Sequence, residues 1–218
     1  MMSLDLAPSA LALILVMFGQ LLFIGIPFLV FKWQKKSIKD EWNIRTTPNT
    51  KSWRRRIGDL ALGVAIGAGF LYVGSYLIQA IRFVTTAFLG EEFFRRAQTG
   101  GVSTSPPSMS PVEGIILIVL QFVLVGLCEE FFFRGVVFRE LSCKSLGIGL
   151  FGSSFIFMLY HVFPGIVPWS TFFIMGPYYF IFGLLLALIV HFQKFDLLTA
   201  ITAHGTFNAL LIALRYFF

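Results

Sequence analysis

The chain has 218 residues, of which 57% are hydrophobic and 13% are charged, and its mean hydropathy is +0.82. Soluble domains carry about 25% charged residues, so this composition excludes an ordinary soluble domain and indicates an integral membrane protein. The net charge is +6, and nine of the 17 Lys and Arg residues fall between Lys32 and Arg56. A short basic segment between apolar segments is typical of a cytoplasmic loop. We therefore expect membrane lipid, and no nucleic acid, as a partner.

Six segments are apolar enough to be interpreted as membrane helices, since crossing a bilayer takes roughly 20 residues. In chain order, they are 8–31, 58–86, 113–141, 147–163, 170–190 and 197–217. The sequence thus predicts an all-α polytopic membrane bundle of about six transmembrane helices. Between the second and third spans, 87–112 is expected to hold a short interfacial helix followed by a flexible loop.

We expect a single integral membrane domain over 1–218, with N-terminal helices and loops in 1–112 and a motif-bearing core in 113–218. If the basic segment 32–57 is cytoplasmic, the turns 142–146 and 191–196 lie on the same side, and each adds a lysine.

The second span carries two features with structural interpretations. Its glycines are predicted to be close-packing contacts with another helix, namely Gly63, Gly67, Gly69 and Gly74. Asp59 lies near the start of the span, where a negative charge favours a helix.

The third span contains charged residues at a depth where they are unfavourable. Glu129 and Glu130 follow an apolar run, and Arg134 comes one helical turn later. A charged side chain at the bilayer centre costs at least ~2.5–3.5 kcal/mol, so these groups require partners, water or a function. Glu130 and Arg134 are four residues apart and can form an ion pair on one helix face. Glu129 has no partner at that spacing, which makes it a candidate general base.

Two later spans supply imidazoles and an amide. His161 lies near the end of the fourth span, and His204 and Asn208 share a face of the last span. Glu129 and His161 each lie about 20 Å of helix from the turn between their spans, so a hairpin brings them to a similar depth. The sequence therefore predicts that these groups meet in a cytoplasm-facing intramembrane cavity. Taken singly, each also has a structural interpretation as a buried ion pair or a hydrogen bond between helices.

Three motifs in this order resemble those of the type II CAAX prenyl endopeptidases. They are Glu129-Glu130-x-x-x-Arg134, Phe157-x-x-x-His161 and His204-x-x-x-Asn208, on successive apolar segments. The wider group is the CAAX-protease and bacteriocin-processing (CPBP, Abi) family of intramembrane glutamic proteases. The resemblance covers 129–208 and implies an endopeptidase without a metal or another cofactor.

The resemblance also implies a role for each matching residue. Glu129 and His161 would bind and activate the hydrolytic water. Glu130 and Arg134 would shape and charge-balance the site, and His204 and Asn208 would stabilise the oxyanion. The substrate would be a peptide or protein, with or without a C-terminal prenyl group. The implied location is the plasma membrane of a prokaryote, with the active site open to the cytoplasm.

Other functional classes stay open from the sequence. A zinc metalloprotease could use His161, His204 and Glu129 as ligands, although the chain has no His-Glu-x-x-His motif. A non-catalytic peptide-binding or bacteriocin-immunity protein could share the same fold. A transporter could use the intramembrane acids as a proton relay.

Overall fold

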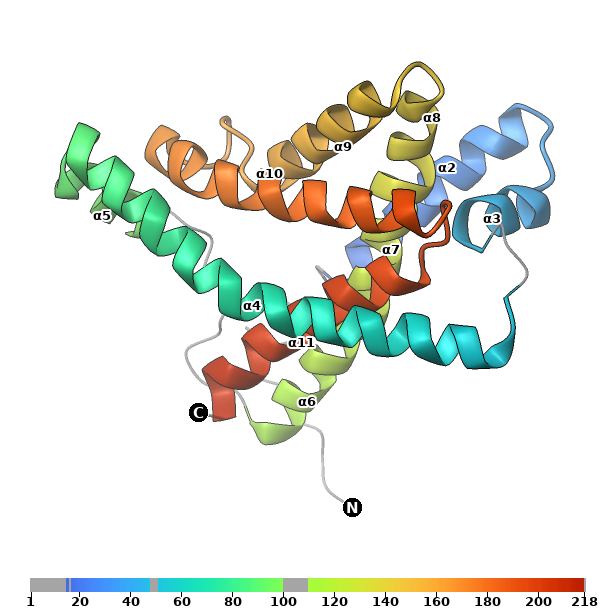
Figure 1. Cartoon of the computed structure of the whole chain (residues 1–218), viewed down its shortest axis with the longest axis horizontal. Coiled ribbons are helices and arrows are strands. Elements are labelled where there is room, and N and C mark those ends of the chain that lie inside the picture. Colours follow the sequence, from blue (N-terminus) through green and yellow to red (C-terminus); the bar gives the residue numbers. More distant parts are fainter. Residues whose placement is uncertain (1–14, 16, 48–50, 100–109, 218) are drawn as a thin grey trace.

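The computed structural model describes residues 15, 17–47, 51–99 and 110–217, and every regular element in these ranges is helical (Figure 1). The expected all-α class is confirmed. The first helices in chain order are α2 (Leu22–Trp33), α3 (Ile38–Thr46), α4 (Trp53–Leu89) and α5 (Glu91–Thr99). The third predicted span is one continuous helical segment, divided into α6 (Pro111–Leu120), η1 (Gln121–Val125), α7 (Gly126–Glu130), η2 (Phe131–Phe138) and α8 (Arg139–Ser142). The last helices are α9 (Leu146–His161), α10 (Trp169–Phe192) and α11 (Leu198–Phe217).

Within the described residues, three helices are long and apolar enough to cross a membrane, namely Trp53–Leu89, Pro111–Ser142 and Trp169–Phe192. They coincide with the second, third and fifth predicted spans. Three shorter apolar helices, Met17–Trp33, Leu146–His161 and Leu198–Leu214, fall in the remaining predicted segments. The count of six spans stays a prediction, and most of 8–16 lies outside the described residues.

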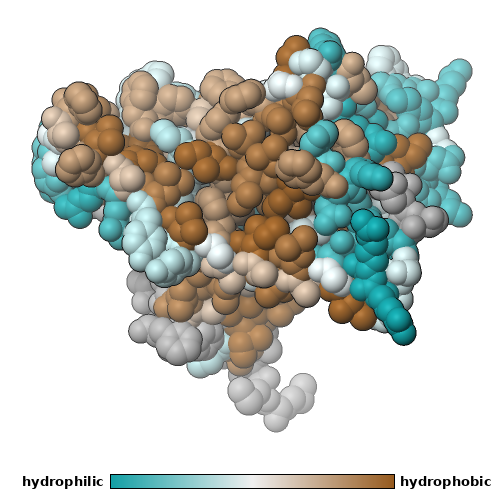
Figure 2. Space-filling view, viewed as in Figure 1, coloured by the Kyte–Doolittle hydropathy of each residue, from teal (hydrophilic) through white to brown (hydrophobic). Residues whose placement is uncertain are grey.

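The face of the molecule seen in Figure 2 has an apolar middle and polar ends. Apolar residues cover the centre of this face, whereas hydrophilic residues gather at the end formed by α3 and the start of α4, and again near α5. Exposed aromatic side chains on the long helices include Phe83 on α4 and Phe173 on α10. Apolar patches of this extent are rare on proteins surrounded by water, so the middle of the molecule suits contact with lipid.

Helices α4 and α11 approach each other closely at small residues. A Cβ atom at Gly67 would lie 2.4 Å from the carbonyl oxygen of Ala203, and one at Gly63 would lie 2.6 Å from Cβ of Thr202. The predicted close contacts are thus confirmed at these positions. A Cβ at Gly74 would likewise meet the Tyr178 hydroxyl, on α10, at 2.9 Å.

The prediction for Gly69 is wrong, because nothing lies within 4 Å of a Cβ added there. Its α4 neighbours Gly63, Gly67 and Gly74 face other helices, whereas Gly69 faces away from them.

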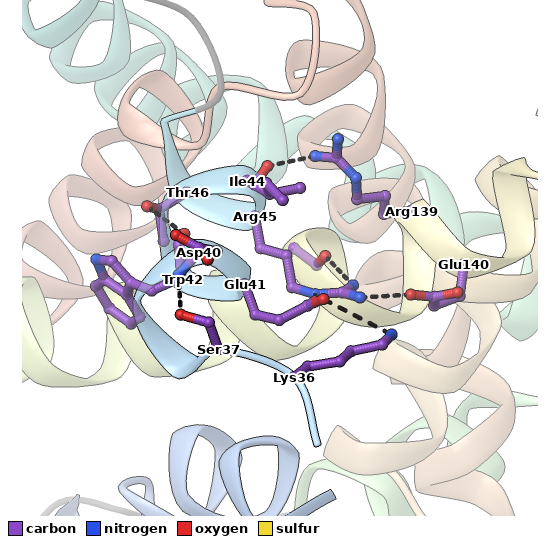
Figure 3. A network of polar contacts seen from close by, with 11 residues as sticks. Lys36, Ser37, Asp40, Glu41, Trp42, Ile44, Arg45, Thr46, Arg139 and Glu140 are labelled. Atoms are coloured by element: carbon purple, nitrogen blue, oxygen red, sulfur yellow. Dashed lines mark hydrogen bonds and ion pairs between the residues drawn. The ribbon is translucent and has the colours of Figure 1, made fainter. Parts of the chain in front are cut away.

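The basic segment contains a helix that the sequence did not predict, α3, which docks on the third span (Figure 3). Arg45 is 4% exposed and donates hydrogen bonds to Glu41 (2.8 Å), to Glu140 (2.6 Å) and to the carbonyl oxygen of Gly135 (3.1 Å). Beside it, Arg139 donates to the carbonyl oxygen of Ile44. These bonds attach α3 to the part of the third span that follows the acidic pair.

The same end of the molecule joins α3 and α4 to the start of α11. The carbonyl oxygen of Thr46 accepts a hydrogen bond from the Leu197 N–H at 2.8 Å. Lys51 lies 2.7 Å from Asp59 and 3.3 Å from Asp196, whose other oxygen accepts from the N–H of Leu198. The connections at 32–57, 142–146 and 191–196 therefore lie at one end of the bundle.

Asp59 lies further from the start of its helix than the predicted span suggested, because α4 begins at Trp53. It lies in the second turn of α4, is 6% exposed and forms an ion pair with Lys51.

Helix α5 confirms the short helix expected within 87–112. Its buried Phe94 packs with Ile81 and Ile174, while Arg95 and Arg96 donate to Glu92 on the exposed side. The hydrogen bond from Arg95, followed by that from Arg96, lowers the pKa of Glu92 to about 2, so this side stays charged. Its interfacial position stays a prediction, and the loop expected at 100–109 lies outside the described residues.

Candidate active site

Two π-helical stretches flank the turn that carries the acidic pair. η1 ends at Val125, α7 carries Glu129 and Glu130, and η2 begins at Phe131. A π-helical turn is wider than an α-helical turn and frequently occurs at functional sites. It changes the direction in which the following side chains point. Both carboxylates point into the protein, since Glu129 is 2% exposed and Glu130 is fully buried.

Glu130 is the centre of a buried polar cluster. Its Oε1 atom accepts a hydrogen bond from Arg134 at 3.0 Å and lies 2.8 Å from Nδ1 of His204. Arg134 also donates to the carbonyl oxygen of Gly183 at 3.0 Å, and its guanidinium lies 4.3 Å above the ring of Phe157. The ion pair predicted between Glu130 and Arg134 is therefore present. The hydrogen bond between Glu130 and His204 was not predicted, because these two residues are 74 positions apart.

The carboxylate of Glu129 faces two imidazoles. Its Oε2 atom lies 3.8 Å from Nε2 of His161 and 3.8 Å from Nε2 of His204. These distances exceed those of direct hydrogen bonds. Within the part of the chain that the structure describes, this buried oxygen has no hydrogen-bond partner. Leaving such an oxygen unpaired is costly, so a polar ligand between the carboxylate and an imidazole would stabilise the site.

The ring of His161 is held in one orientation. Its Nδ1 lies 2.9 Å from the carbonyl oxygen of Phe157, which can only accept a hydrogen bond. Nδ1 therefore carries a proton, and Nε2, which faces Glu129, has a free lone pair when the imidazole is neutral. The ring also stacks on Tyr179, with centroids 4.4 Å apart and planes inclined by 24°.

A pocket of about 290 Å³ opens beside Glu129 and His161, where α9 ends and α10 begins. Three further polar side chains lie on its wall, namely Tyr160, Thr171 and Tyr179. The apolar part of the wall is formed by Val162, Val167 and Met175. The tyrosines were not predicted as site residues from the sequence, although Tyr160 directly precedes His161.

The structure brings five of the six predicted site residues into contact, whereas Asn208 is not part of these contacts. Asn208 lies one turn beyond His204 on α11 and is half-buried. Its side chain makes no hydrogen bond within the described ranges, and it does not line the pocket. His204 is 2% exposed and does not line the pocket either.

Among the described residues, no group of three or more His, Cys, Asp and Glu side chains is arranged to hold a metal ion. Metal-independent hydrolysis stays a prediction.

The fold and the site together define an all-helical protein with membrane-length helices and a buried cluster of acids and imidazoles. Residues 111–210 match the family model of the Rce1-like proteins, described as type II CAAX prenyl endopeptidase Rce1-like. This match confirms the resemblance seen in the three motifs. The family is one of peptidases, and the matched segment contains all six predicted site residues. Comparisons with curated proteins and with solved structures found no match. The division of 1–218 at residue 112 stays a prediction.

Proposed function

We propose that this protein is an intramembrane glutamic endopeptidase that hydrolyses a peptide bond with a water activated by Glu129 and His161. The observation that carries the proposal is the 3.8 Å separation between Glu129 Oε2 and His161 Nε2 at the wall of the pocket. A water between these atoms could donate one hydrogen bond to the carboxylate and one to the imidazole. Glu129 would accept the proton as the water oxygen adds to the scissile carbonyl carbon, and would return it to the departing amine.

The charged and polar side chains around Glu129 support this role. Arg134 forms its ion pair with Glu130, so the guanidinium neutralises that fully buried carboxylate and does not bind Glu129 directly. The Nδ1–H of His204 donates to Glu130, which directs its Nε2 toward Glu129. As the resemblance implies, we assign stabilisation of the developing oxyanion to His204 and Asn208, although neither lines the pocket.

We further propose a multi-pass protein of a prokaryotic plasma membrane, with the connections 32–57, 142–146 and 191–196 on the cytoplasmic side; the opening of the site to the cytoplasm stays a prediction. The grouping of the connections 32–57, 142–146 and 191–196 at one end supports a shared side for their positive charge. His161 ends α9, about 24 Å of helix from the turn at 142–146, so the substrate must reach deep into the membrane. A peptide segment within or next to the bilayer, with or without a prenyl group, meets this requirement.

The test uses the purified full-length protein in lipid nanodiscs and two internally quenched peptides. Both end in the same CAAX sequence, and only one is farnesylated on its cysteine. We expect cleavage that persists in excess EDTA and 1,10-phenanthroline. Loss of cleavage on chelation, restored by zinc alone, would favour the metalloprotease. Binding of the peptides without cleavage would favour a binding or immunity protein.

A further inference from the structure

Tyr160 lies on the wall of the same pocket as the proposed catalytic pair. It occupies the last turn of α9, directly before His161, and lines the pocket with His161 and Glu129. Its ring stands edge-on to that of His161, with centroids 4.9 Å apart and planes inclined by 83°. Phe23 on α2 and Phe133 on η2 pack on the tyrosine ring with centroids at 5.0 and 5.6 Å. The tyrosine ring is therefore packed by two other helical elements, although the residue is 42% exposed.

The hydroxyl of Tyr160 retains its donor capacity. Nε2 of Gln20 donates a hydrogen bond to the tyrosine oxygen at 2.7 Å. A phenol has one proton to donate and can accept separately through its oxygen, so this bond leaves its proton available. Accepting a hydrogen bond also polarises the O–H bond and makes it a stronger donor. Gln20 thus orients and activates the group without occupying its proton.

The two residues assigned to the oxyanion do not lie on the pocket wall. His204 is 2% exposed, uses Nδ1 to bond Glu130 and does not line the pocket. Asn208 does not line it either. Tyr179 also lies on the wall, and the face of its ring stacks on His161. Among these groups, Tyr160 combines a place on the wall, a bonded and oriented hydroxyl, and a proton free to be donated.

We propose that Tyr160 is a further catalytic residue, whose hydroxyl donates a hydrogen bond to the oxygen of the scissile carbonyl. As the water oxygen bonds to the carbonyl carbon, Glu129 takes the water proton and the C=O π electrons move to the carbonyl oxygen. That oxygen gains negative charge and a stronger bond from the phenol, which keeps its proton throughout. The inference rests on the proposed function and adds a donor to those assigned to His204 and Asn208.

The test is Tyr160→Phe, which removes the hydroxyl and keeps the ring that packs on Phe23 and Phe133. We expect kcat on whichever of the two quenched peptides wild type cleaves to fall about 10²-fold, the loss typical of one such donor. KM should stay within about twofold, because the bond strengthens only in the transition state. The matched control is Tyr178→Phe, which should keep wild-type kcat. Tyr178 is the next tyrosine along the chain; it lies on α10 and does not line the pocket. Thermal unfolding should be the same for both variants.

Two inhibitors and the variant Gln20→Met distinguish a catalytic role of Tyr160 from a structural one. A phosphonate analogue of the cleaved peptide should bind Tyr160→Phe more weakly by the factor lost in kcat/KM. The same peptide with a reduced, uncleavable bond should bind Tyr160→Phe with the same affinity as it binds wild type. Gln20→Met should lower kcat by less than Tyr160→Phe, because the phenol proton remains. If both variants raise KM with kcat unchanged, the pair only holds α2 in place and the inference is wrong.

The inference and the proposed function can fail separately. Full kcat in Tyr160→Phe beside an inactive Glu129→Gln would reject the role of Tyr160 alone. A large loss in Tyr179→Phe with none in Tyr160→Phe would assign the donor to the other tyrosine. Activity in Glu129→Gln, or no cleavage by wild type, would reject the proposed function and this inference with it.

Discussion

His204 Nδ1 lies 2.8 Å from Oε1 of Glu130, so the last helix is bonded to the third span inside the protein. The same oxygen accepts a hydrogen bond from Arg134, and these three side chains are at most 2% exposed. One buried carboxylate therefore joins a guanidinium to an imidazole. Removing either partner leaves the buried carboxylate with an unbalanced charge or with one hydrogen bond fewer.

Arg134→Ala is expected to destabilise the protein by ~3–5 kcal/mol, the usual consequence of removing one member of a buried pair. The measurement is thermal unfolding in a fixed detergent. Combining Glu130→Gln with Arg134→Gln should recover part of the loss, because no unpaired charge is left. Arg96→Ala is the control, since Arg96 pairs with Glu92 on an exposed face and should contribute under ~1 kcal/mol. Equal unfolding temperatures for Arg134→Ala and Arg96→Ala would contradict the buried pairing.

Gly67→Ala is expected to destabilise the protein by ~1–3 kcal/mol, because the added methyl group collides with the backbone of α11. The collision is at Ala203, the residue before His204, so peptidase activity should fall as well. Gly69→Ala, two residues along the same helix, has open space and should stabilise by about 0.5–1 kcal/mol. Unfolding and activity of the two variants are compared in parallel. Destabilisation of similar size in both would show that α4 does not pack through Gly67.

Arg45→Ala should destabilise the protein by about 1–3 kcal/mol, since it leaves the buried carbonyl of Gly135 without this donor. Arg45→Lys should not restore stability, because a single ammonium cannot reproduce the planar set of bonds to three acceptors. Lys39→Ala, at an exposed position on α3, is the control and should change unfolding little. Full recovery with lysine would mean that only the charge of Arg45 matters.

Cysteine labelling in sealed vesicles tests the membrane topology. Ser52→Cys and the native exposed Cys143 should react with a membrane-impermeant maleimide from the same side, because the structure places their connections at one end. Ser105→Cys, in a Cys143→Ser background, should react only from the opposite side. Reaction of Ser52→Cys and Ser105→Cys from one side would reject the orientation inferred from the basic segment.

The apolar pattern was sufficient to predict the helical class and the helices near 58–86, 113–141 and 170–190. Charge at helical spacing was sufficient for the pair of Glu130 and Arg134. Both depend on neighbours within one segment, where periodicity and length contain the information.

The sequence did not predict features that depend on tertiary contacts. Helix α3 has a polar sequence, and it is fixed by the bonds of Arg45 to the third span. The bonds of His204 to Glu130 and of Gln20 to Tyr160 join residues far apart in the chain. The π-helical stretches beside Glu129 follow no residue pattern that the sequence analysis used.

The central claim is that Glu129 is the base for peptide hydrolysis, and Glu129→Gln tests it most directly. The control is Glu113→Gln, another buried carboxylate on the third span, which caps the start of α6 and whose replacement by Gln preserves a capping side chain. Both purified variants are assayed in nanodiscs on the quenched CAAX peptides, with His161→Ala alongside. Glu129→Gln and His161→Ala should lose cleavage while remaining folded, and Glu113→Gln should retain it. Full turnover by a folded Glu129→Gln protein would contradict the glutamic mechanism.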